Sequence, residues 1–373
     1  MEWLPSHYFS LFYLAIVSIL CFNKVFFLVN NDDHNSIFGT KSITNIIFSI
    51  VLAVCIIFFF GNRPATADFG DTYYYIHSYN LKEGYLKFSY DQEWIWNNLN
   101  VFCRDLGMDV SVFFTIIAFF YVGPILFICW RIMRNNVFLA FLFCVISFSF
   151  YGYGINGIRN GMACSIVLIG ISLLIGKNKL ENLFAIVFLI IAYFIHRSTL
   201  VPSICLIFAK YIINKPSIAI NFWFISILIS VVFGNFVGNF IESTGIYDEK
   251  MDYFLDASDS GIASQFSSTG FRWDFLLYSS MPVLMTWYIT IKRNFIDNTF
   301  NILATTYILA NSFWIMIIRA TYSNRFAYLS WFLYPLIIAY PLIRMNIWDD
   351  QDKKAGLILL LYTGFTVFMF LKG

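Results

Sequence analysis

Long apolar stretches separated by short polar segments dominate this chain. A bilayer core about 30 Å thick needs about 20 helical residues to cross it. Twelve stretches approach that length, at 8–29, 42–60, 111–130, 137–152, 161–175, 182–196, 198–213, 218–240, 274–291, 299–318, 326–343 and 355–371. The pattern predicts one all-α, polytopic membrane domain over residues 1–373, with about 12 (11 or 12) transmembrane helices.

The sixth and seventh stretches form the least regular pair, because His196, Arg197 and Ser198 interrupt them. Each half is shorter than a full span, so the two could be one interrupted helix or a hairpin. Basic residues near both outer ends favour a hairpin that returns to the cytoplasm. We expect the turn between the halves to lie below the outer membrane surface.

Composition supports a membrane location and excludes several other classes. Only 12% of the residues are charged and 59% are hydrophobic, whereas soluble domains carry about 25% charged residues. The net charge is +2 and no basic run exceeds two residues, so nucleic-acid binding is not expected. The first 20 residues lack a basic start and a cleavage site, and are expected to be a retained helix.

Lysine and arginine are distributed differently between the loops. Placing the lysine-rich loops in the cytoplasm leaves both termini and two long loops, 61–110 and 241–273, outside. The short outer loops then carry arginine but no lysine, at Arg159, Arg197, Arg319 and Arg325. Because guanidinium binds phosphate in a bidentate manner, these arginines predict an anion site. The alternative is that they extend to lipid headgroups or helix ends.

The two long loops are acidic and aromatic, which favours a carbohydrate ligand. In the first, residues 93–102 predict an amphipathic helix at the outer interface. Asp68 and Asp71 could hold a metal ion, but no third ligand lies at close spacing. We therefore expect a metal-independent site without a cofactor, in which arginines neutralise phosphate.

His196 ends an apolar helix and is followed at once by Arg197. An ionisable pair at that depth normally faces a wet cavity or the bundle interior. The neighbouring cation should lower the pKa of the imidazole and keep it neutral, as a general base requires. The alternative is a histidine that only caps the helix.

Residues 155–202 carry a family resemblance. Ile158-Arg159 followed by Ala163, and His196-Arg197-Ser198 about 35 residues later, resemble the central signature of EpsG-like, Wzy-type bacterial polysaccharide (O-antigen) polymerases. Weaker similarities lie at Phe69–Thr72 with Glu93, and at Asn324–Tyr328.

The resemblance implies a GT-C-like glycosyltransferase in the bacterial inner membrane, with its active site facing the periplasm. Such an enzyme transfers a growing glycan from undecaprenyl pyrophosphate to the non-reducing end of a lipid-linked repeat unit. A Wzz-type chain-length regulator is a partner implied by the family alone.

Roles for individual residues follow as a hypothesis. Arg159, Arg319 and Arg325 would bind the pyrophosphate, while His196 as base and Arg197 would lie at the reaction centre. Asp71 is the second candidate for the base. Arg63 would hold the second lipid pyrophosphate, and Arg272 is a further outer arginine for substrate binding.

Three other functions share some of these features. A flippase or secondary transporter also suits twelve spans, although no internal repeat is visible and the charges gather on one side. A membrane O-acyltransferase would need a cytoplasmic thioester site. O-antigen ligase shares the chemistry and differs in its acceptor.

Overall fold

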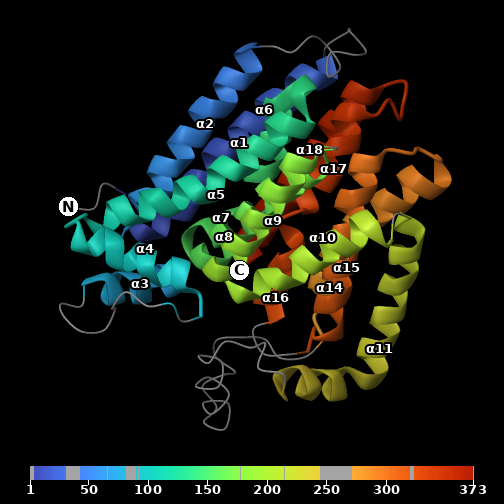
Figure 1. Ribbon diagram of the computed structural model, residues 1–373. Coiled ribbons are helices and arrows are strands. Elements are labelled where there is room, and N and C mark those ends of the chain that lie inside the picture. The colour runs from blue at the N-terminus through green and yellow to red at the C-terminus, as the bar shows by residue number, and fades with distance from the viewer. Residues whose placement is uncertain are drawn as a thin grey trace. The chain divides into compact units, whose positions relative to one another are not determined.

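The computed structural model describes residues 4–30, 43–64, 66–80, 90, 92–176, 178–213, 215–243, 271–319 and 323–372. Throughout these ranges every regular element is a helix (Figure 1). The all-α prediction is therefore confirmed. Most of the predicted second outer loop, 241–273, lies outside the described residues.

The helices divide into two compact units, residues 1–199 with 338–373, and residues 200–337. The first unit contains α1 (Ser6–Asn30), α2 (Ile43–Gly61), α3 (Asp71–Asn80), α4 (Trp94–Asp105), α5 (Val110–Ile132), α6 (Val137–Val145), α7 (Phe148–Ile155), α8 (Ile158–Leu174), α9 (Lys179–Ile195) and α18 (Gln351–Lys372). Short 3₁₀ turns lie at Ala67–Phe69, Arg134–Asn136 and Arg197–Thr199. The prediction of a single domain remains a prediction.

The second unit contains α10 (Leu200–Tyr211), α11 (Pro216–Ser243), α14 (Trp273–Trp287) with a π-helical turn (Tyr288–Lys292), α15 (Asn298–Met316) and α16 (Ser323–Trp331). Helix α17 (Tyr334–Arg344) crosses the boundary between the units. Within the second unit, α15 packs against α10, α11 and α16. A buried hydrogen bond from the Trp223 indole to Asn311 joins α11 to α15.

Every predicted apolar stretch coincides with helix. Among the described residues, six helices are long and apolar enough to cross a membrane: Ser6–Asn30, Ile43–Gly61, Val110–Ile132, Pro216–Phe233, Arg325–Arg344 and Gln351–Lys372. A seventh span results if residues 134–145 and 148–155, bent by 70° at their junction, count as one. The chain is thus a helical membrane protein. Twelve spans and a GT-C-like fold remain predictions.

Helix α8 lies in the core of the first unit, in contact with α5, α7 and α9. Most of its side chains are buried, which fits a helix that is apolar on all sides. The outward faces of α1 and α2 expose large apolar side chains, such as Phe26 and Ile43. Such faces suit contact with lipid rather than water.

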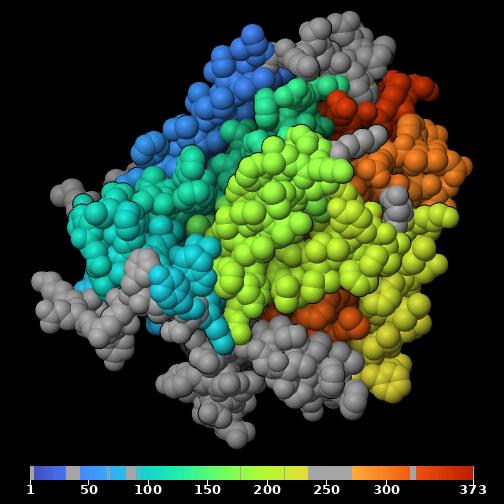
Figure 2. Space-filling model, in the orientation of Figure 1, coloured from blue at the N-terminus to red at the C-terminus, as the bar shows by residue number. Residues whose placement is uncertain are grey.

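The outer loop 61–110 is folded where it is described. The helix predicted at 93–102 is present as α4, which packs against α9. Trp94 of α4 lies 5.7 Å from Phe194 of α9, measured between ring centroids. In Figure 2 the cyan surface of α4 lies directly beside the green to yellow-green surface of α9. The first outer loop therefore covers the end of α9, while its position at the membrane interface remains a prediction.

Candidate active site

The end of α9 positions His196. The backbone N–H of His196 still bonds to Ala192, but its φ of −153° and ψ of 114° are extended and end the helix. Thr199 then donates both its backbone N–H and its hydroxyl to the His196 carbonyl. This short turn satisfies the helix end locally and directs the imidazole away from the helix axis.

A break between α7 and α8 positions Arg159. The N–H groups of Asn156 and Gly157 both bond to Gly152, which closes the last turn of α7. Helix α8 begins at Ile158, so Arg159 lies in its first turn. Because α8 contacts both α9 and the turn that follows it, Arg159 and His196 lie at one end of the same helix pair.

Glu93, in the first outer loop, is the third residue that meets at this point, together with Arg159 and His196. It precedes α4 and adopts a left-handed conformation, with φ 60° and ψ 32°, which residues other than glycine seldom adopt. A residue at this position normally caps the helix with its side chain, but the Glu93 carboxylate makes no capping bond. The unusual backbone instead turns a buried carboxylate away from α4.

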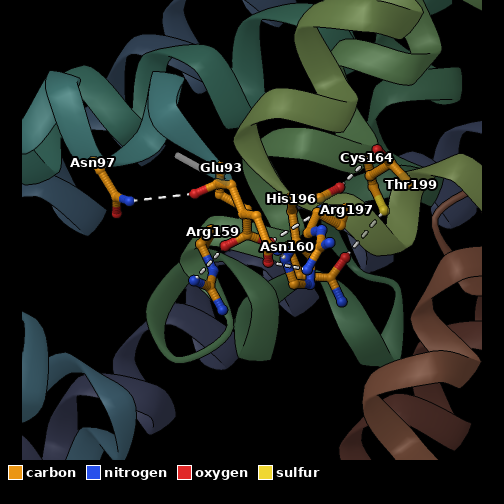
Figure 3. Close-up of polar contacts among 9 residues, drawn as sticks. Glu93, Asn97, Arg159, Asn160, Cys164, His196, Arg197 and Thr199 are labelled. Atoms are coloured by element: carbon orange, nitrogen blue, oxygen red, sulfur yellow. Dashed lines mark hydrogen bonds and ion pairs between the residues drawn. The ribbon is translucent and has the colours of Figure 1, made fainter. Parts of the chain in front are cut away.

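Both carboxylate oxygens of Glu93 are engaged (Figure 3). Oε1 lies 2.7 Å from His196 Nδ1 and accepts the Arg197 backbone N–H at 3.0 Å. Oε2 accepts from Arg159 Nη1 at 2.7 Å. Arg197 also donates through its guanidinium to Gln92. We call Glu93, Arg159, His196 and Arg197 the Glu93 cluster.

The surroundings keep Glu93 ionised. Burial by itself would raise its pKa, but the hydrogen bond to His196, the charge of Arg159, the charge of a protonated His196 and the Arg197 backbone N–H together lower the pKa to about 2. An ionised carboxylate can only accept hydrogen bonds, so His196 Nδ1 must donate. The lone pair of the neutral imidazole is then on Nε2.

The cluster has the charge balance of an anion site. Two guanidinium groups and one carboxylate leave one net positive charge when His196 is neutral. The side chains of Arg159 and His196 are each 16% exposed, so water or substrate can reach both. The cluster thus places an imidazole, held by a carboxylate, beside two guanidinium groups that could bind a phosphate.

The structure gives Arg63 different surroundings from those expected of a pyrophosphate ligand. Its side chain is buried and Nη1 donates to the carbonyls of Gly154 and Ile155, at 3.2 and 2.6 Å. Burial lowers the pKa of Arg63 to about 9, so the guanidinium is still charged at neutral pH. Because only 6% of Arg63 is exposed, a lipid headgroup has little access to its guanidinium, and we revise the role of Arg63.

Asp71 is the first residue of α3, and its backbone N–H donates to the Asn156 side chain at 2.8 Å. Its carboxylate is half-buried. The carboxylate in contact with His196 is that of Glu93. The role of Asp71 as the second candidate for the base, or as a ligand of the acceptor, stays a prediction.

The remaining predicted arginines lie in the second unit. Arg272 precedes α14, pairs with Asp274 at 2.7 Å and lies over the Phe275 ring. Arg319 is exposed beyond α15 and donates to the Val231 carbonyl at 3.4 Å. Arg325 is exposed on α16. Their convergence with Arg159 on one pyrophosphate remains a prediction.

Across the described ranges, no group of three His, Cys, Asp or Glu side chains could hold a metal ion. Asp68, one of the two carboxylates considered for a metal, accepts a hydrogen bond from the Ser6 hydroxyl at 2.5 Å. Metal-independent chemistry remains a prediction.

The sequence analysis singled out Arg159, His196 and Arg197 but assigned no role to Glu93, which contacts all three. Glu93 is separated from Arg159 by 66 residues and from His196 by 103. Its one signal in the sequence was its place in a weak family similarity downstream of Phe69–Thr72.

Comparison with known proteins identifies one family. The sequence profile of the EpsG family matches residues 46–372, which is most of the chain. No curated protein and no solved structure matches significantly.

Proposed function

The chain belongs to the EpsG family, and from this premise we propose that it is a polysaccharide polymerase acting on lipid-linked oligosaccharides. In the proposed reaction a growing glycan leaves undecaprenyl pyrophosphate and joins the non-reducing end of a lipid-linked repeat unit. The reaction would take place at the periplasmic face of the bacterial inner membrane and need no metal.

The observation that carries this proposal is the contact between Glu93 and His196. The carboxylate fixes the imidazole with Nδ1–H toward Glu93, so that Nε2 can accept a proton from the acceptor hydroxyl. Glu93 also stabilises the imidazolium that forms, as the acidic member of a catalytic triad does. The dyad therefore has the geometry of a general base.

Arg159 and Arg197 would stabilise the lipid pyrophosphate as it leaves. As the acceptor oxygen bonds to the anomeric carbon, the bond from that carbon to the pyrophosphate oxygen breaks and its electron pair leaves with the lipid. Guanidinium groups already in place stabilise that developing charge. Because a guanidinium has five N–H donors, Arg159 can bind Glu93 and a phosphate oxygen together.

The ionised Glu93 has a second consequence for glycosyl transfer. The transition state has oxocarbenium character, and a nearby carboxylate lowers its energy electrostatically. Held by Arg159, His196 and the Arg197 backbone, the Glu93 carboxylate is a positioned negative charge. Arg319 and Arg325 remain candidate ligands of the pyrophosphate.

The direct test is incubation of purified protein with a defined lipid-pyrophosphate repeat unit, followed by separation of the products by length. We expect His196→Gln to lower the transfer rate about 10²–10⁴-fold, the usual contribution of one base. Glutamine can still donate to Glu93, so this variant removes the base while it preserves the contact. Arg159→Ala should also lower the rate.

His77→Ala is the matched control, because His77 is an exposed histidine of the same outer loop. It should give the wild-type product ladder, and a chelator should leave that ladder unchanged. Wild-type lengths and rates from both His196→Gln and Arg159→Ala would refute the proposed site. Movement of lipid-linked repeats across vesicles without lengthening would support the transporter alternative.

A further inference from the structure

Arg63 lies at the carboxyl end of α7, where its guanidinium binds the last two carbonyls of that helix, Gly154 and Ile155. The final carbonyls of a helix have no partner within the helix and carry its partial negative charge. A cation in this place satisfies them and matches the charge. Arg63 therefore stabilises the point where α7 stops and the chain turns into α8.

The segment that follows Arg63 binds the same point. Thr72 donates its hydroxyl to the Ile155 carbonyl at 2.5 Å, and the Asn156 side chain accepts the Asp71 backbone N–H. Gly70 has a φ of +55°, and a Cβ there would lie 2.8 Å from the Asn156 side-chain oxygen. We call Arg63, Gly70, Asp71, Thr72 and Asn156 the α7 clasp.

Burying the Arg63 guanidinium in this place costs free energy. Arg63 is only 6% exposed, and its Nε and Nη2 have no hydrogen-bond partner among the described residues. Buried polar groups without partners are uncommon, and each is expected to have a reason. The guanidinium also lies 4.1 Å from the centre of the Phe114 ring of α5, which holds its plane against that helix.

Ile155, whose carbonyl accepts from both Arg63 and Thr72, is four residues before Arg159 in the chain. Between Ile155 and Arg159 there are only Asn156, Gly157 and the first residue of α8. Gly157 has no side chain of its own to fix the turn. A shift of the Ile155 carbonyl would therefore move the start of α8, and with it the guanidinium that meets Glu93.

We propose that Arg63 is a positioning residue, which sets the first turn of α8 so that Arg159 can bind both Glu93 and the pyrophosphate donor. This inference rests on the proposed function, because the quantity that tests it is how well the enzyme uses the lipid-pyrophosphate donor that Arg159 is proposed to bind. In this role Arg63 acts through α8, whereas the sequence had predicted that it binds a lipid pyrophosphate directly.

A double-mutant cycle on purified protein tests the proposal. Arg63→Gln should raise the KM for the lipid-pyrophosphate donor and lower kcat/KM about tenfold, because small misplacement of a binding group is costly. In an Arg159→Ala background the same substitution should change kcat/KM by less than about twofold. Such strong non-additivity is expected when one residue acts through another.

Conservative variants keep the test falsifiable if Arg63→Gln folds poorly. Thr72→Val removes one clasp bond and should raise the donor KM, whereas Thr72→Ser keeps the hydroxyl and should restore it. Equal effects of Arg63→Gln in both backgrounds, or a donor KM that Thr72→Val leaves unchanged, would overturn the proposal. If Arg159→Ala alone has no effect on transfer, it is the proposed function that fails.

Discussion

At the residue scale, the ionised Glu93 affects both the stability of the fold and the tautomer of His196. The carboxylate is buried yet held by a cation, an imidazole and a backbone N–H, so its charge is stabilised inside the protein. Removing one partner of a buried ion pair leaves the other charge uncompensated, which usually costs more than the pair contributes. Glu93 should thus matter for folding as well as for the tautomer of His196.

The pH dependence of stability follows from the lowered pKa of Glu93. The pKa is about 2 in the folded protein against an ordinary value of 4.5, so the stabilisation is present above pH 4.5. It is lost as pH falls from 4.5 toward 2, and its full size is about 3 kcal/mol. Thermal unfolding in detergent between pH 6 and pH 3 measures this loss.

Glu93→Gln is the comparison for that measurement. At pH 6 the variant should unfold at a lower temperature than the wild type, since Arg159 loses its carboxylate. The gap between the two unfolding temperatures should narrow as pH falls from 4.5 toward 3. A gap that stays constant over the whole range would mean that the pKa of Glu93 is the same in the folded and the unfolded protein.

At the scale of single elements, the position of Arg159 depends on how closely α8 packs against α7 at the break between the two helices. A Cβ on Gly161 of α8 would lie 2.5 Å from the Tyr153 backbone carbonyl of α7 and 3.2 Å from the Tyr121 ring. The first contact is with backbone, which cannot rotate away. Glycine at this position therefore allows α8 to start where it does.

Gly161→Ala should destabilise the protein by about 1–3 kcal/mol, the usual cost of overpacking, and should lower polymer yield because Arg159 is two residues away. Unfolding in detergent and product length measure the two effects. Gly364→Ala, on α18, is the control, because a Cβ there meets nothing within 4 Å. It should be neutral or slightly stabilising. Equal stability of the two variants would contradict the steric argument.

At the scale of the whole molecule, the prediction concerns which side of the membrane the Glu93 cluster faces. Loops rich in lysine are expected in the cytoplasm, which places the first outer loop and the end of α9 outside. Gln92 is an exposed residue next to Glu93, and Lys353 is exposed at the start of α18. These two positions report on opposite sides in the proposed topology.

Cysteine labelling tests the topology in cells whose cytoplasmic membrane is intact. In a background without the seven native cysteines, Gln92→Cys should react with a membrane-impermeant maleimide added outside. Lys353→Cys should react only after the membrane is permeabilised. The reverse pattern would place the site in the cytoplasm and exclude a periplasmic polymerase.

The sequence by itself determined where the helices lie. The apolar stretches coincide with helices because burial in lipid or protein is encoded locally, residue by residue. The same holds for the helix predicted at 93–102 and for the polar break at His196, both of which are present. His196 could be selected because an ionisable residue at the end of an apolar helix is seldom without function. Arg159 could be selected because the short outer loops carry arginine but no lysine.

Only the tertiary structure decided which groups meet. Glu93 joins His196 and Arg159 across 103 and 66 residues, and its left-handed backbone has no signature in composition or periodicity. In the same way Arg63, predicted from the sequence to hold the second lipid pyrophosphate, is buried at the end of α7, 91 residues away from Gly154 in the chain. Hydrogen bonds between distant segments depend on how helices pack, and no local pattern carries that information.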